Sequence, residues 1–125
     1  MAVWTQNKLV IRGVGARVPA GNGAGIRFEQ GALKVRNCRF IDNENGILTS
    51  NHPAAVLEIE NSEFADIRQG GERWKHNLYV GAIRTLKVSG SYFHRAWIGH
   101  LLKSRAAENH ILYNRLTDET DGRAS

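Results

Sequence analysis

Lys103, Arg105 and Arg115 lie within the stretch "GHLLKSRAAENHILYNR" (99–115) and are the first candidates for chemistry in this sequence. Like charges next to an amine lower its pKa, and guanidinium groups bind carboxylates. Three cations on one short stretch could therefore form a nucleic-acid patch or belong to a catalytic surface. The alternative is that Lys103 and Arg105 are solvated cations on a strand and the turn after it. The residues alone leave both interpretations open.

The histidines are the second group of candidates. Alignment of the repeats described below places His100 near Asn77, so His76 and His100 are expected to be neighbours on adjacent turns. With Tyr79 they could supply an acid and a base, or bind a metal. No His-x-His or His-x-x-x-His spacing occurs, so no metal site is predicted and structural or surface roles stay open. Trp74 could present an aromatic face to a sugar ring.

A repeat of about two dozen residues organises the chain that must position these side chains. One type of segment starts with Leu-x-(Val or Ile) and ends in Phe: "LKVRNCRF" (33–40), "LEIENSEF" (57–64), "LKVSGSYF" (86–93), with "NHILYNRL" (109–116) as a weaker copy. Short apolar segments of a second type lie at 23–30, 44–51, 75–82 and 98–105. The repeating unit is predicted as a strand, a turn, a second strand and a loop.

Strands this short cannot bury an apolar face alone, but turns stacked on one another form a continuous core. We therefore predict an all-β fold, a parallel β-helix (solenoid) of about five coils, as a single domain over residues 1–125. A small antiparallel sandwich or barrel is the alternative, and it would need hairpin turn residues that are mostly absent. The segments 15–25 and 65–75 are rich in glycine and are expected to project as loops.

The repeat also predicts columns of equivalent residues. The aligned ends of the four segments should form an apolar stack of Phe40, Phe64, Phe93 and Leu116. A second column is predicted to contain turn asparagines, namely Asn37, Asn61 and Asn114. A third column holds Cys38, Ser62 and Ser91, which indicates a small packing site rather than a nucleophile.

Charge and composition limit the classes of partner. Lys and Arg number 17 against 12 Asp and Glu, which gives a net charge of +5. A basic surface suits polyanions such as acidic polysaccharide or nucleic acid. Nucleic acid is the less favoured partner, because no stacking-aromatic motif with interleaved basic residues occurs. No apolar run is long enough to span a membrane, and the single cysteine excludes an internal disulfide.

The quoted segments, together with "NGAGIRFE", "VRNCRFIDNENGIL" and "SYFHRAWIGHLLKSRA", resemble bacterial right-handed parallel β-helix proteins of the pectate-lyase-like superfamily. The resemblance implies a right-handed solenoid, a periplasmic or secreted setting, and relatives that include alginate lyases, chondroitinase B type lyases and uronate epimerases. The start of the chain carries no signal-peptide pattern. Binding of an acidic polysaccharide, with lyase or C5-epimerase activity if the chain is an enzyme, is the implied function. A non-catalytic structural or assembly module is the alternative.

The same resemblance implies residue roles. Lys103 matches the lysine that acts as the Brønsted base, and Arg123 matches an arginine about one coil later. Arg105, His100, His76, Tyr79 and Trp74 are the expected substrate-binding residues. Relatives bind calcium through acidic residues shortly before the lysine, but "HRAWIGHLL" (94–102) has none, so no cofactor is predicted.

The resemblance also suggests that the chain is a segment of a longer solenoid without end caps. Uncapped ends expose strand edges and apolar cross-sections, so self-association is expected.

Overall fold

The structure is a computed structural model that describes residues 2–3, 9–12, 23–67, 75–96, 98–117 and 123–124. The described residues contain strands and turns and no helix. All the strand pairs are parallel, and each strand pairs with the strand at the same position in the next turn of the chain. The predicted parallel β-helix is therefore confirmed, and the antiparallel sandwich or barrel is wrong.

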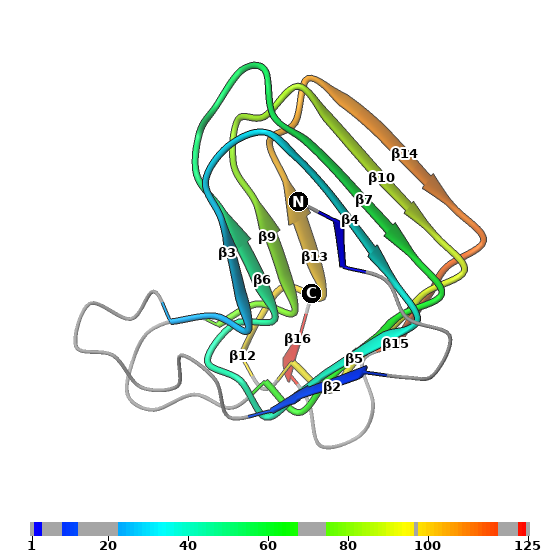
Figure 1. Cartoon of the computed structure of the whole chain (residues 1–125). Coiled ribbons are helices and arrows are strands. Elements are labelled where there is room, and N and C mark those ends of the chain that lie inside the picture. Colours follow the sequence, from blue (N-terminus) through cyan, green and yellow to red (C-terminus); the bar gives the residue numbers. More distant parts are fainter. Residues whose placement is uncertain are drawn as a thin grey trace.

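Three sheets form the walls of the solenoid (Figure 1). Sheet A contains β1 (Ala2–Val3), β4 (Ala32–Arg36), β7 (Val56–Glu60), β10 (Thr85–Ser89) and β14 (Glu108–Leu112). Sheet B contains β2 (Leu9–Arg12), β5 (Cys38–Ile41), β8 (Glu63–Ala65), β11 (Tyr92–His94) and β15 (Arg115–Thr117). Sheet C contains β3 (Ile26–Phe28), β6 (Ile47–Thr49), β9 (Leu78–Val80) and β13 (Leu102–Ser104). A separate pair joins β12 (Ile98–Gly99) to β16 (Arg123–Ala124).

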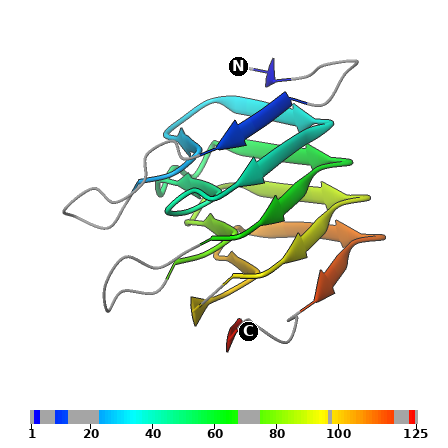
Figure 2. The ribbon, with the colours of Figure 1, turned by 90° about the horizontal axis from the view of Figure 1, so that it is seen from below.

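Three consecutive turns, β4–β6, β7–β9 and β10–β13, run through sheets A, B and C; the short strands β1–β3 precede them, and β14 and β15 follow them. The predicted number of about five coils is therefore too high, because the strands at the two ends of sheets A and B do not belong to these complete turns. Figures 1 and 2 together show that the chain turns clockwise as it recedes from a viewer at the N-terminal end, so the solenoid is right-handed.

Each turn contains three strands rather than the two predicted, because the Leu-to-Phe segments bend in the middle. The bend lies at Asn37, Asn61, Gly90 or Tyr113, all with positive φ. Asparagine and glycine tolerate this left-handed conformation better than most residues. The first half of each segment therefore joins sheet A and the second half joins sheet B.

The predicted asparagine column is correct for two members and wrong for the third. The side-chain amide of Asn61 donates to Asn37 Oδ1 at 2.6 Å, one turn away. Asn114 instead lies in the next column, because the register pairs Tyr92 with Arg115 and Phe93 with Leu116. Aligned at Leu116, the fourth copy already places Asn114 with Ser91, so the error lay in assigning Asn114 to the asparagine column.

The Cys38 column is a hydrogen-bonded ladder. The backbone N–H of Cys38 donates to Ser62 Oγ at 3.2 Å, the N–H of Ser62 donates to Ser91 Oγ at 3.1 Å, and the N–H of Ser91 donates to Asn114 Oδ1 at 2.9 Å. Cys38 is buried, and burial raises the pKa of its thiol. These contacts support a packing role for Cys38, as the aligned serines predict.

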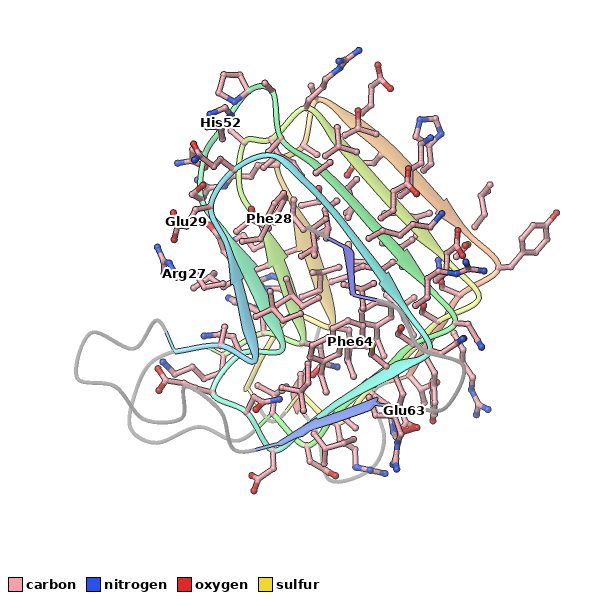
Figure 3. The ribbon with its side chains drawn as sticks, viewed as in Figure 1. Arg27, Phe28, Glu29, His52, Glu63 and Phe64 are labelled. Atoms are coloured by element: carbon pink, nitrogen blue, oxygen red, sulfur yellow. The ribbon has the colours of Figure 1, made fainter. Side chains whose placement is uncertain are left out.

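A stack of phenylalanine rings fills the core behind sheet B. The rings of Phe40 and Phe64 are stacked with centroids 4.6 Å apart, and those of Phe64 and Phe93 are 4.7 Å apart. All three side chains are fully buried, and Phe64 points into the interior in Figure 3. Leu116 continues the column by register but is 45% exposed. The predicted apolar stack is therefore confirmed for its three phenylalanines.

We predict that Phe64→Ala lowers the free energy of unfolding by about 3–5 kcal/mol, because it removes the central ring of this stack and leaves a cavity. Urea denaturation followed by circular dichroism measures the change. Phe64→Leu retains most of the apolar volume and serves as the matched control, with a smaller expected loss. A Phe64→Ala midpoint equal to that of the unmodified protein would contradict the role assigned to the stack.

Candidate functional site

The outer face of sheet C brings Tyr79 and Lys103 together. The register pairs Lys103 of β13 directly with Tyr79 of β9, while their strand neighbours Leu78 and Val80 point into the core. Lys103 Nζ lies 5.0 Å from the centroid of the Tyr79 ring, and the guanidinium carbon of Arg105 lies 5.9 Å from it. Two cations from one turn therefore share a single aromatic ring on the previous turn. Both are within the range of a favourable cation–π contact.

In the earlier turns, the outward position of sheet C carries different residues. The register places Leu48 beside Tyr79 and Arg27 beside Leu48. Arg27 of β3 forms an ion pair with Glu29, which follows the strand, and both side chains point outward in Figure 3. The concentrated positive charge on sheet C is therefore confined to the turns that carry Tyr79 and Lys103.

His76 and His100 lie on the same two turns, just before β9 and β13. The backbone N–H of His100 donates to His76 Nδ1 at 2.8 Å, and the two Nδ1 atoms are 3.2 Å apart. The His76 ring also packs against Tyr79, with centroids 5.2 Å apart. We call the five residues His76, Tyr79, His100, Lys103 and Arg105 the basic cluster. The sequence alignment was shifted by one residue, since His100 lies over His76 rather than Asn77, but its conclusion that the two histidines are neighbours is correct.

His76 is held as a neutral imidazole at neutral pH. Its side chain is only 8% exposed, and burial together with the charges of His100, Lys103 and Lys75 lowers its pKa from 6.5 to about 4. Burial removes the water that would solvate a charged ring, and the neighbouring cations disfavour a further positive charge. His76 therefore contributes a hydrogen-bond acceptor to the basic cluster rather than a positive charge.

A buried ion pair to the preceding turn anchors Lys75, the residue before His76. Lys75 Nζ lies 2.8 Å from Glu44 Oε1, and each side chain is 2% exposed. The adjacent Asn45 accepts the backbone N–H of His76 at 3.0 Å and donates to the carbonyl of Gly23 at 2.9 Å. A buried ion pair is costly to break because one charge would remain unpaired in the interior. The backbone of His76 is therefore held firmly against the preceding turn.

Gly99 allows the two histidine turns to approach. A Cβ atom at this position would lie 1.9 Å from the carbonyl oxygen of Lys75, and the φ of Gly99 is +142°. Any larger residue would push β12 away from the preceding turn. The His76–His100 contact therefore depends on a glycine that sequence inspection did not single out.

Two predicted residues cannot be placed in the basic cluster. Trp74 lies outside the described residues, as do most of the two expected projecting loops. Arg123 belongs to β16, and its backbone pairs with Ile98 rather than with Lys103. The side chain of Arg123 is outside the described part of the structure, so its predicted catalytic role stays a prediction.

Sequence reasoning missed a second contact between an aromatic ring and a cation, on sheet B. The guanidinium carbon of Arg115 lies 5.0 Å from the centroid of Tyr92, and Tyr92 stacks on His94 with centroids 3.8 Å apart. The register pairs Tyr92 with Arg115, as it pairs Tyr79 with Lys103. The signal available in the sequence was a tyrosine and a cation separated by one repeat. Arg115 is thereby separated from Lys103 and Arg105, although all three come from one stretch of sequence.

The described residues contain no group of three or more His, Cys, Asp or Glu side chains that could hold a metal ion. Within the same residues no helix is long and apolar enough to cross a membrane. The chain matches no protein-family model, no curated protein and no solved structure.

His76 makes the stability of the fold sensitive to acid. The unfolded chain takes up a proton on His76 near the ordinary pKa of 6.5, whereas the folded chain does so only near about 4. Between these values the unfolded state binds more protons, so the free energy of unfolding falls as the pH is lowered through this window.

We predict that His76→Asn flattens this part of the pH–stability profile. The Oδ1 atom of asparagine can replace Nδ1 as the acceptor for His100, but asparagine does not titrate. Urea denaturation at several pH values between about 7 and 4 measures the slope. His110→Gln, at an exposed position, is the control and should keep the slope of the unmodified protein. An unchanged slope in His76→Asn would contradict the assignment.

Proposed function

We propose that the basic cluster binds an acidic polysaccharide, with carboxylates of the polymer contacting Lys103 and Arg105. The observation that carries the proposal is the shared position of these two cations over the ring of Tyr79. The ring holds two long side chains next to each other before a ligand arrives. Less conformational entropy is then lost when they bind a polyanion.

The ion pairs elsewhere on the solenoid support this choice of site. Many described cations are paired with acidic residues: Arg27, Lys34, Arg36, Arg39, Lys75, Lys87 and Arg95. Lys103 and Arg105 form no ion pair with a described residue. Their charges are therefore available to an external anion.

A linear polyanion fits this surface better than an isolated small anion. The strands of a parallel sheet lie about 4.8 Å apart, so the four strands of sheet C give its outer face a regular spacing along which a polymer can lie. Uronate polymers repeat a carboxylate on each sugar, and arginine binds carboxylates through paired hydrogen bonds. Membership of the pectate-lyase-like superfamily is part of the same proposal, and the right-handed parallel solenoid supports it.

We predict that Lys103→Ala combined with Arg105→Ala weakens binding to polygalacturonate or alginate about tenfold at low salt, because two contacts to carboxylates are lost. Isothermal titration calorimetry measures the affinity. Lys87→Ala on the outer face of sheet A removes one exposed cation elsewhere and should leave binding nearly unchanged. Equal weakening by Lys87→Ala would show that net charge alone drives the binding. Tighter, salt-sensitive binding to DNA would favour a nucleic-acid ligand.

The same protein and polymers also test whether the chain is an enzyme. β-Elimination by Lys103 produces an unsaturated uronate that absorbs ultraviolet light, and C5-epimerisation changes the sugar composition without that absorbance. Activity that survives in Lys103→Ala would exclude Lys103 as the base. Binding without either product would leave a non-catalytic polysaccharide-binding module.

We also propose self-association through the last described turn. Four apolar side chains are exposed there: Ile111, Leu112, Tyr113 and Leu116. Ile111 and Leu116 continue core columns by pairing with Val88 and Phe93, and no described strand pairs with the outer edges of β14 and β15. A second copy would bury these side chains and supply partners for the open edges.

Light scattering tests the self-association, and the expected result is an average mass that rises with protein concentration. Ile111→Asp places a charge on the exposed core column and should reduce this rise. Lys87→Asp changes an exposed residue one turn earlier and is the control. A constant monomer mass over a wide concentration range would contradict the proposal.

A further inference from the structure

The outer face of sheet B carries another arginine, Arg115, that is separate from the basic cluster. Strands β5, β8, β11 and β15 place Arg39, Glu63, Tyr92 and Arg115 in one row by register. Arg39 is balanced by Glu63 at 3.0 Å, whereas the guanidinium carbon of Arg115 lies 5.0 Å from the ring centroid of Tyr92. Arg115 is exposed and forms no ion pair with a described residue. Its charge is therefore available to an external anion.

Two contacts orient the guanidinium of Arg115. Its Nε atom donates to Thr117 Oγ1 at 3.3 Å, and its carbon lies over Tyr92, whose ring is stacked on His94 with centroids 3.8 Å apart. Because Nε is engaged by Thr117, the two terminal nitrogens of the guanidinium are the donors for a ligand. Parallel N–H groups on these nitrogens match the two oxygens of a carboxylate.

The acidic residue of this row does not neutralise Arg115. Glu63 lies on β8, two strands before β15, and it contacts Arg39 at 3.0 Å and His94 Nε2 at 3.7 Å. Strands of a parallel sheet lie about 4.8 Å apart, so the turn that carries Tyr92 separates the two charges. An anion at Arg115 is therefore on the far side of Tyr92 from this carboxylate.

Arg115 and the basic cluster lie on different walls of the solenoid. Figure 1 shows sheets B and C as two walls that face different directions. Tyr92 and Tyr79 are each flanked by a buried strand neighbour, Phe93 and Val80, so both point outward from their own sheets. A straight polymer segment on the outer face of sheet C therefore does not lie along Arg115. The two places take different segments of polymer, or two different chains.

We propose that Arg115 forms a second binding site for acidic polysaccharide, on sheet B, so that one molecule holds two polymer segments on two faces. A carboxylate of the polymer contacts the terminal nitrogens of Arg115. The sheet B site depends on the contacts of Arg115 alone, whereas the bridging of two segments rests on the proposed function of the basic cluster. Two weak sites on one molecule bind a long or multivalent polymer more tightly than either site does alone.

Titration with digalacturonate, followed by NMR of the backbone amides, measures the affinity at each sheet separately. Amide signals of β11 and β15 report on sheet B, and those of β9 and β13 report on sheet C. Both groups should shift in the unmodified protein. Arg115→Gln is expected to weaken the sheet B affinity about twofold to fivefold, as one exposed charge is removed, and to leave the sheet C affinity unchanged.

Two further variants separate the geometry of Arg115 from its charge. Arg84→Gln is the matched control, because Arg84 is also exposed and forms no ion pair or ring contact with a described residue. It should leave both affinities unchanged, and weakening equal to that of Arg115→Gln would overturn the inference. Arg115→Lys keeps the charge but lacks the parallel N–H groups, so it should also weaken the sheet B site. Unchanged binding in Arg115→Lys would overturn the role of the terminal nitrogens.

The same titration distinguishes the sheet B site from the proposed function of the basic cluster. Amides of β11 and β15 that do not shift, or that respond equally in Arg115→Gln, would overturn the sheet B site even if β9 and β13 respond. A response of β11 and β15 without one of β9 and β13 would support the sheet B site and overturn the proposed function and the bridging.

A surface coated with polygalacturonate tests the bridging. The coated surface should capture the protein, and the captured protein should then retain a soluble, fluorescently labelled polygalacturonate chain. Arg115→Gln is expected to retain less of the labelled chain than the unmodified protein. Equal retention by the two proteins would overturn the bridging.

Discussion

The fold depends on one constraint, which is that each turn must place the same kind of side chain above its equivalent in the turn before. The stacked rings of Phe40, Phe64 and Phe93 show the constraint in the core, where successive centroids are less than 5 Å apart. Parallel pairing sets this spacing, since neighbouring strands lie about 4.8 Å apart. Flat aromatic rings satisfy it by stacking. Hydrogen bonds satisfy it at the corners, where Asn61 donates to Asn37 and backbone N–H groups donate to Ser62 and Ser91.

The same register assembles the basic cluster. Tyr79 and Lys103 are 24 residues apart in the sequence but become direct neighbours because each occupies the outward position of a sheet C strand. His76 and His100 meet because they occupy equivalent positions on the same two turns, just before these strands. A buried ion pair between Lys75 and Glu44 holds the earlier of the two turns. The site is therefore a consequence of the solenoid and needs no dedicated loop to place these five side chains.

The proposed chemistry follows from what surrounds each polar group. Acidic residues on sheets A and B balance much of the positive charge there, whereas Lys103 and Arg105 contact an aromatic ring. One imidazole is buried and stays neutral, and the other reaches the surface. The two histidines thus differ in exposure to solvent although they are in direct contact.

The sequence by itself determined the repeat. The repeat was sufficient to predict the fold class, the phenylalanine stack and the strands of sheet C. These features depend on apolar residues that recur at a fixed spacing, which is a local and readable pattern. Sequence reasoning divided each turn into two strands, because the positive φ at Asn37 and Asn61 leaves only a weak local signal. It also aligned His100 with Asn77 instead of His76, since these short segments match too weakly to define their register. Asn114 was assigned to the asparagine column although it aligns with Ser91. Only the tertiary structure decided which cations face Tyr79 and which histidine is buried. It also showed that Gly99 permits the contact between His76 and His100. All three features depend on atoms that belong to different turns.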